Sequence, residues 1–281
     1  SDLHFGGHAD LPQLEALDEF LASLGVSAVV ISGDLSQRAR HGEFQAAHLF
    51  IRRLRTHTPA LVIPGNHDIE WWKSPFDLAG ERAKYAKYLR YFGPELRPWL
   101  EVPGAVIAGA LSSYGVVAGS LTWNLRDIAV KGHLPAAETD RVGQLFAAAP
   151  ANAVRVLVTH HNVLAGALSR RMGLAHWRST HRRLVATGAD VILCGHDHQE
   201  GAGQIEGTLA VSTAGTHSFR SRHGRPSVFN LVRVEAHAVH IQHYRYETAG
   251  KRFLRSDTAS FARKGGGTAA TVSVAGGDQP L

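Results

Sequence analysis

Aspartate, asparagine and histidine side chains cluster at five places in the sequence, four of them directly after short apolar runs. The clearest example is Gly65-Asn66-His67-Asp68, which comes directly after the apolar run at 60–64. Carboxylate, amide and imidazole groups are all ligands for divalent transition metals in proteins. These four close a β-branched or apolar run, so each is expected at the end of a buried strand. The other four clusters are Asp2-Leu3-His4, Gly33-Asp34, Thr159-His160-His161-Asn162 and Gly195-His196-Asp197-His198.

The five clusters together contain the side chains that a site for two metal ions requires. Two divalent ions about 3.5–4 Å apart can act on one phosphate ester, and they need a shared carboxylate, imidazoles and further oxygen donors. Mixed nitrogen and oxygen ligands favour Mn, Fe, Zn or Co over Mg or Ca. The candidate ligands, from separate strand ends, are Asp2, His4, Asp34, Asn66, His160, His196 and His198.

Each cluster also has a purely structural explanation. Asp2 could be a disordered terminal acid, Asp34 a helix cap, and Gly65-Asn66 an ordinary turn. His196 and His198 could be surface histidines of a loop. These explanations would have to coincide five times in one chain, so we favour a shared site.

The rest of the chain predicts the elements that would position these clusters. Alternating strands and helices indicate a parallel sheet with ligands at the carboxyl ends of its strands. Short strands after residue 200 would extend a second sheet. The expected fold is α/β, a four-layer αββα sandwich of two mixed sheets flanked by helices. Helices are predicted over 11–24, 43–54, 81–92, 136–148 and 176–187, and strands over 26–31, 60–63, 106–111, 154–158, 191–193, 209–212, 227–234 and 238–246.

The sequence predicts one domain over residues 1–250 and a C-terminal extension over 251–281. Glycine, alanine, serine and threonine dominate from about residue 256, so that part is expected to be disordered. The layout also requires a strand before Asp2, whereas the sequence opens at Ser1. We therefore expect a first strand, and any targeting segment with it, to be missing from this sequence.

Composition limits the class of protein. The chain has 281 residues, of which 44% are hydrophobic, enough for one sizeable core. The one cysteine, Cys194, excludes an internal disulfide and favours a cytoplasmic location. No apolar run approaches the roughly 18 residues of a membrane-spanning helix.

The net charge of +6 suits a small anionic substrate; nucleic acid is a possible but not a favoured partner. Nothing in the sequence indicates an oligomeric state.

The order of the five clusters resembles that of the calcineurin-like metallophosphoesterases, whose motifs are Asp-x-His, Gly-Asp, Gly-Asn-His-Asp, a histidine after a strand, and Gly-His-x-His. The resemblance covers about residues 1–245, and residues 1–6 and 195–198 are most similar to the bacterial branch, which includes class III cyclic-nucleotide phosphodiesterases. It implies hydrolysis of a phosphodiester, a cyclic nucleotide or similar small diester, by a metal-bridging hydroxide. The alternatives are a phosphomonoesterase or nuclease of the same superfamily, and a non-catalytic scaffold with this fold.

The resemblance also implies a distribution of ligands. One ion would be held by Asp2, His4 and His198, with Asp34 bridging to a second ion held by Asn66, His160 and His196.

Further roles follow from the same resemblance. His67 would face the leaving oxygen, as a proton donor or as a stabiliser of developing charge. His161 would lie near the substrate or behind the ligands, and Asp68 would orient His67 or cap the next segment. Arg38 would contact a substrate phosphate or form a surface salt bridge. Gln37 stands where Ser/Thr protein phosphatases keep an aspartate, which disfavours a protein-phosphatase role.

Overall fold

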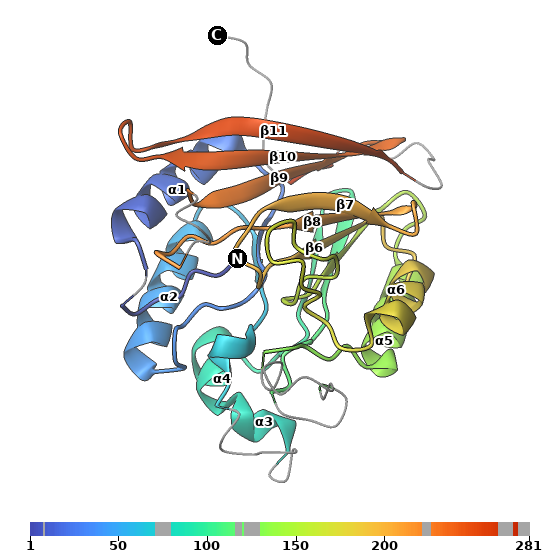
Figure 1. Cartoon of the computed structure of the whole chain (residues 1–281), viewed down its shortest axis with the longest axis horizontal. Coiled ribbons are helices and arrows are strands. Elements are labelled where there is room, and N and C mark those ends of the chain that lie inside the picture. Colours follow the sequence, from blue (N-terminus) through green and yellow to red (C-terminus); the bar gives the residue numbers. More distant parts are fainter. Residues whose placement is uncertain are drawn as a thin grey trace.

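The chain folds into four layers, in the order helix, sheet, sheet, helix (Figure 1). The computed structural model describes residues 1–7, 9–70, 80–115, 120, 130–220, 226–263 and 272–274. Valine, isoleucine and leucine side chains from the two sheet layers meet in a central cluster, and each outer face of the sheets is covered by helices. The predicted αββα sandwich is therefore confirmed.

One sheet layer has six strands in the order β3-β4-β5-β6-β8-β7. Its four middle strands pair in parallel, and both edge strands pair antiparallel to their neighbours. The middle strands are rich in Val, Ile, Leu and Ala because both of their faces are covered. The strands are β3 (Trp99–Val102), β4 (Ala105–Gly109), β5 (Val154–Val158), β6 (Val191–Cys194), β7 (Gly201–Ile205) and β8 (Leu209–Thr213).

The other sheet layer is made of two separately paired sheets. β1 (Val29–Ile31) pairs in parallel with β2 (Ala60–Val62). The second sheet has the order β11-β10-β9-β12 and is antiparallel. Ser1 and residues of β1 and β9 line an apolar cavity between the two sheets. The strands of the second sheet are β9 (Val228–Val234), β10 (Ala238–Glu247), β11 (Arg252–Ala262) and β12 (Val272–Val274).

Six α-helices of the described chain cover the two sheet layers, and α1 shows why they begin and end where they do. The Asp10 side chain accepts a hydrogen bond from the Gln13 amide at its start, and Gly25 ends it with a φ of +59°. The apolar faces of α1, α2 and α4 pack on the layer of β1 and β9, while α5 and α6 cover the six-stranded sheet. The helices are α1 (Leu11–Leu24), α2 (His41–Leu54), α3 (Glu81–Lys84), α4 (Ala86–Phe92), α5 (Ala136–Ala148) and α6 (Trp177–Ala186).

The helix predicted over 81–92 is divided at Tyr85. The Tyr85 amide bonds the Arg82 carbonyl, a tight turn that ends α3. The Tyr85 ring is fully buried, and its hydroxyl donates to the Ser113 carbonyl. The buried Tyr85 side chain and its hydrogen bond to Ser113 therefore hold the boundary between α3 and α4, which the helical spacing of the sequence does not predict.

The C-terminal segment differs from the prediction of disorder from about residue 256. β11 continues to Ala262 and pairs with β10 over most of its length. Phe253 is buried in the core next to Phe20 and Phe229. Backbone pairing and this aromatic anchor outweigh the polar composition, so the prediction was wrong for residues 256–262. Residues 264–271 and 275–281, to which the same prediction extends, lie outside the described chain.

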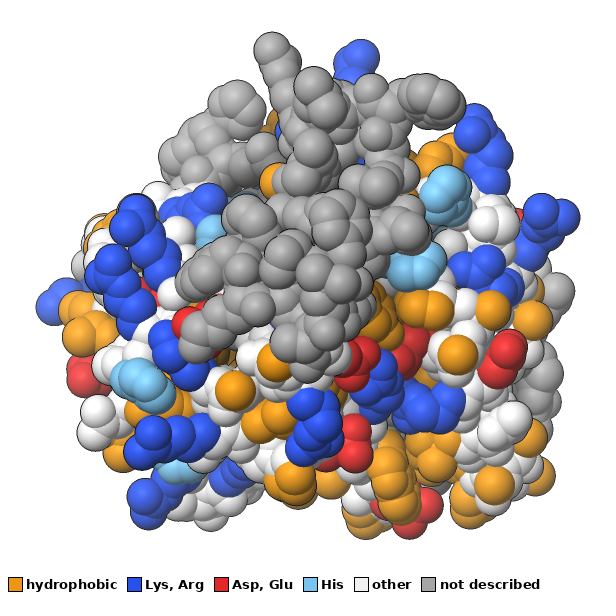
Figure 2. All heavy atoms as spheres, turned by 90° about the horizontal axis from the view of Figure 1, so that it is seen from below, with side chains coloured by type: hydrophobic (Ala, Val, Ile, Leu, Met, Phe, Trp, Pro, Cys, Tyr) orange, Lys and Arg blue, Asp and Glu red, His pale blue; other side chains and the backbone are white. Residues whose placement is uncertain are grey.

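One face of the molecule carries mixed charges. Figure 2 shows Lys and Arg side chains spread among acidic, apolar and other polar ones on the described part of that face. Within the residues described, no helix has the length and apolar character needed to cross a membrane.

Candidate metal centre

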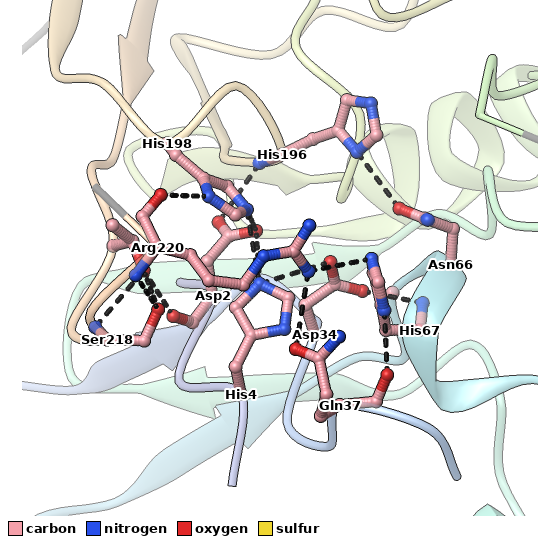
Figure 3. Close-up of polar contacts among 12 residues, drawn as sticks. Asp2, His4, Asp34, Gln37, Asn66, His67, His196, His198, Ser218 and Arg220 are labelled. Atoms are coloured by element: carbon pink, nitrogen blue, oxygen red, sulfur yellow. Dashed lines mark hydrogen bonds and ion pairs between the residues drawn. The ribbon is translucent and has the colours of Figure 1, made fainter. Parts of the chain in front are cut away.

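The five clusters meet because backbone hydrogen bonds continue past the ends of the strands. The amides of Asp2 and His4 donate to the carbonyls of Gly33 and Asp34, each at 3.0 Å, and the Gly195 amide donates to the His160 carbonyl at 2.8 Å. The predicted ligand segments are thereby tied side by side at one edge of the sandwich (Figure 3).

Five of the seven predicted ligands have a left-handed backbone, with φ between +46° and +72°. A positive φ is uncommon for residues other than glycine, and it is found more often at functional sites. Here it turns each side chain sharply at the end of its strand, toward the common centre. The five are Asp2, His4, Asp34, His196 and His198.

The first group of donor atoms surrounds one oxygen of Asp34. The Nε2 atom of His4 lies 3.8 Å from Asp34 Oδ2 and 3.9 Å from Asp2 Oδ1. The Nε2 atom of His198 lies 3.1 Å from His4 Nε2 and 3.3 Å from Asp2 Oδ1. All four side chains, Asp2, His4, Asp34 and His198, thus direct a donor atom at one point.

The second group surrounds the other oxygen of Asp34. The Nε2 atom of His160 lies 3.4 Å from Asp34 Oδ1 and 3.0 Å from Asn66 Oδ1. The Nδ1 atom of His196 lies 2.9 Å from Asn66 Oδ1 and 3.3 Å from His160 Nε2. Asp34 therefore faces both groups, one with each carboxylate oxygen, as a bridging ligand must.

Outer hydrogen bonds orient two of the imidazoles. His160 Nδ1 donates to the Ser32 carbonyl at 2.7 Å, and His198 Nδ1 donates to the Arg220 carbonyl at 2.8 Å. A proton held on Nδ1 leaves the lone pair of Nε2 free to bind a cation. Both rings are thus held in the tautomer that a metal ligand needs.

The donor set fits a pair of divalent cations. The Oδ1 atom of Asp2 is fully buried and has no hydrogen-bond partner among the described residues. A buried carboxylate oxygen in that state is costly unless a cation or a donor faces it. Two carboxylates, one amide and four imidazoles converge on two adjacent points, which is donor chemistry for divalent transition metals.

The pKa values of four of these groups favour cation binding, whereas burial at His198 is outweighed by the hydrogen bond and charge of Asp2, which raise its pKa. Burial lowers the pKa of His4 and of His196 to about 3, so both rings are neutral ligands at ordinary pH. Burial works toward a higher pKa at Asp2 and Asp34, but neighbouring histidines, led by His198 for Asp2 and His160 for Asp34, hold both below the usual range. The carboxylates are therefore ionised while two of the imidazoles are not.

His67 lies beside the first group of donors. Its backbone amide donates to Asp34 Oδ1 at 2.8 Å, and its ring meets the His4 ring edge-on at 4.9 Å between centroids. Its Nδ1 atom donates to the Gln37 carbonyl at 2.8 Å, and its Nε2 atom accepts from Arg220 Nη1 at 3.2 Å. His67 is thus held next to the donor atoms without contributing one.

His161 lies beside the second group, with a ring nitrogen within 4.8 Å of donor atoms of His160 and His196. Its ring is 4.4 Å from the His196 ring and 5.0 Å from the His160 ring, between centroids. Both of its ring nitrogens already have partners, Ser112 Oγ at 2.9 Å and the Val130 carbonyl at 3.1 Å. Of the two adjacent histidines, His160 is the one that faces Asp34 and Asn66.

The Asp68 carboxylate connects two of the clusters. It accepts hydrogen bonds from the amides of Gly65, Leu35 and Ser36 at 2.8–3.0 Å. Burial, followed by the charge of Asp34, raises its pKa despite these donors. Within the described chain its side chain thus bonds Gly65, just before the turn Asn66–Asp68, and Leu35 and Ser36, just after Asp34, rather than the His67 ring.

Arg38 and Arg220 occupy different positions relative to the centre. The Arg38 side chain is exposed, and its backbone amide donates to Glu43. Arg220, which sequence analysis did not single out, reaches His67 and Gln37. The sequence gives no signal for it, because Arg220 lies seven residues after the buried strand β8 in a segment without a metal-ligand motif.

Comparison with known proteins assigns the family. The sequence model of the calcineurin-like phosphoesterases matches residues 1–200, so the chain belongs to this family. Among proteins of curated function, none matches the sequence.

Solved structures share the fold. A dimetal phosphatase from Danio rerio superposes with a TM-score of 0.59 at 12% identity, over 94% of this chain and 97% of that one. A purple acid phosphatase from yellow lupin, Lupinus luteus, superposes with a TM-score of 0.61 at 10% identity, over 90% of this chain. This chain spans only 49% of the lupin enzyme. Family and fold are thus those of the calcineurin-like phosphoesterases.

Proposed function

We propose that the protein hydrolyses a small phosphodiester, such as a cyclic nucleotide, with two divalent transition-metal ions, Mn, Fe, Zn or Co. The observation that carries the two-ion site is the Asp34 carboxylate, whose two oxygens face two separate groups of donor atoms. Preference for a diester is supported by the sequence resemblance to the bacterial branch of the family. A cytoplasmic location is supported by a single cysteine that is buried and unpaired.

Two sets of residues would hold the ions. Such a pair, when bound, supplies an acidified water and positive charge beside the phosphoryl oxygens. Asp2, His4 and His198 would hold one ion, Asn66, His160 and His196 the other, and Asp34 both.

The remaining side chains of the site would act on the ester itself. His67 keeps one proton on Nδ1, bound to the Gln37 carbonyl, and directs Nε2 toward Arg220. His67 would face the leaving oxygen, as a proton donor or as a stabiliser of developing charge. His161, fixed by Ser112 and Val130, keeps the ring of His196 in place.

Substitution of the bridging carboxylate tests the proposal. The Asp34→Asn protein should lose both ions by elemental analysis and turn over Mn²⁺-supported bis-aryl phosphate about a thousandfold more slowly, because the amide cannot bridge two cations. Asp140→Asn, at an exposed position of α5, is the matched control and should resemble the wild type. Wild-type ion content in the Asp34→Asn protein would contradict the site.

Substrate panels separate the alternatives. Faster turnover of mono-aryl than of bis-aryl phosphate would identify a phosphomonoesterase. Nicking of plasmid DNA that falls steeply with salt would identify a nuclease. Retention of ions without turnover of any ester, together with tight binding of a protein partner, would identify a scaffold.

A further inference from the structure

Arg220 is held over the metal centre by the segment that follows β8. Thr216 Oγ1 donates to the Asp2 carbonyl at 2.7 Å and shares a 2.8 Å hydrogen bond with Ser218 Oγ. The Arg220 amide in turn donates to Ser218 Oγ, and the Arg220 carbonyl accepts from His198. The backbone of Arg220 is therefore fixed to the motifs that carry two predicted ligands.

The guanidinium extends from this anchor across the donor groups (Figure 3). Its Nη1 atom donates to His67 Nε2 at 3.2 Å and to Gln37 Oε1 at 3.3 Å. Neither acceptor is a carboxylate, and no carboxylate in the described chain forms an ion pair with it. Arg220 thus presents a positive charge beside the two donor groups, with further guanidinium N–H groups that have no partner among the described residues.

Two other arginines near the core are in a different situation. Arg97 is paired with Glu81 and Glu138, and Arg263 with Asp190. Those guanidiniums are already neutralised and serve the fold. Arg220 is the one of these three whose charge faces the candidate metal centre instead of a carboxylate.

We propose that Arg220 binds the phosphoryl group of the substrate and is a specificity residue of this site; the inference rests on the proposed phosphoesterase function. A guanidinium matches phosphate oxygens with charge and paired N–H donors. The contacts with His67 and Gln37 hold it in place before substrate arrives, and a phosphoryl oxygen is a stronger acceptor than either. Gln37 then serves to position Arg220.

Binding of orthophosphate to Mn²⁺-loaded protein tests the role directly. By calorimetry, Arg220→Met should weaken orthophosphate binding about 10- to 100-fold, the usual loss for a charge-assisted hydrogen bond. KM for bis-aryl phosphate should rise by a similar factor, while ion content and unfolding temperature stay at wild-type values. Arg220→Lys should recover part of the affinity, because it restores charge but not the paired donors.

Arg252→Met is the matched control, since Arg252 is exposed and pairs with Glu247 at the β10–β11 hairpin; it should leave both measurements unchanged. Wild-type orthophosphate affinity and KM in the Arg220→Met protein would overturn the inference and leave the proposed function standing. A wild-type protein that binds no orthophosphate would also overturn it. Orthophosphate binding that depends on Arg220, without turnover of any ester, would support the inference and refute the proposed function.

Discussion

At the scale of single residues, chemically similar side chains of the candidate metal centre have different contacts and different roles. His160 and His161 are neighbours in the sequence, yet only His160 faces Asp34 and Asn66, while both nitrogens of His161 are bonded elsewhere. Asp34 and Asp68 are both buried, but Asp34 faces imidazoles and Asp68 faces backbone amides. The environment of each side chain, more than its type, decides what it can do.

His67 supplies a test at this scale. His67→Ala should lower kcat about 10²- to 10⁴-fold, the usual contribution of a proton donor, and most for esters with poor leaving groups. Ion content should remain at the wild-type value, because no ring nitrogen of His67 faces either donor group. Loss of ions in elemental analysis would show that the ring has a different role.

Five of the seven candidate ligands could be found from the sequence because each follows an apolar run, and parallel strands bring such positions to one edge. Asp2 and His4 stand at the start of the sequence, and the order of the motifs identified them. Arg220 and Ser112 could not be found from the sequence. Arg220 depends on the course of the Thr216–Ser218 segment, and Ser112 matters only through its contact with His161. Neither position carries a spacing or a residue type that distinguishes it from an ordinary loop.

At the scale of elements, close approach between the strand-end loops fixes the site. A Cβ atom on Gly65 would overlap the backbone and carboxylate of Asp34, and one on Gly33 would lie 2.7 Å from His160 Nδ1. Glycine is therefore required at Gly65 for lack of space and not for its dihedral angles, since its φ is −101°.

Gly65→Ala should consequently displace Asp34. We expect a loss of about 1–3 kcal/mol in the free energy of unfolding, as for other overpacked sites, together with reduced ion content. Gly42→Ala in α2, where a Cβ would meet nothing within 4 Å, is the control and should leave both unchanged or add slight stability. Denaturant unfolding and elemental analysis would measure the two effects, and equal behaviour of the two variants would disprove the steric argument.

β11 allows a second test of an element. Phe253 is 4% exposed and its neighbour Leu254 is 40% exposed, as expected for alternate faces of a strand. Phe253→Ala should lower the free energy of unfolding by about 3 kcal/mol or more, and Leu254→Ala by much less. Similar small losses would mean that β11 is not part of the folded sandwich. The polar residues after 255 make this strand difficult to predict from the sequence. It forms because it pairs with β10.

At the scale of the whole molecule, the fold combines buried strands, which can be predicted from the sequence, with edge strands, which are hard to predict from it. Runs such as Val154–Val158 are apolar at most positions because helices and the second sheet cover both faces. β7 begins with Gly201 and contains one β-branched residue, Ile205, so only its pairing with β8 reveals it.

Global stability should depend on pH through His217. Burial lowers the pKa of His217 to about 3, whereas an unfolded histidine titrates near 6.5. Between these values the unfolded state binds the extra proton, so the stabilising contribution is full above pH 6.5 and falls as the pH decreases toward 3. In chelator-treated protein, His217→Phe should reduce the loss of stability between pH 7 and pH 5 by about 2 kcal/mol. His237→Phe, at an exposed turn, should keep the wild-type loss, and identical pH profiles for all three proteins would refute the prediction.

The left-handed backbone of five predicted ligands implies that the metal site is formed before the ions bind. The five are Asp2, His4, Asp34, His196 and His198. Each such residue costs of order 1–3 kcal/mol in backbone strain, and the surrounding strands impose that cost whether or not a cation is present. Ion uptake would then need no refolding, and one transition metal could replace another without rearrangement of the protein. The fold would then provide a rigid, preformed metal site, and the metals available in the cell would determine which ions bind there.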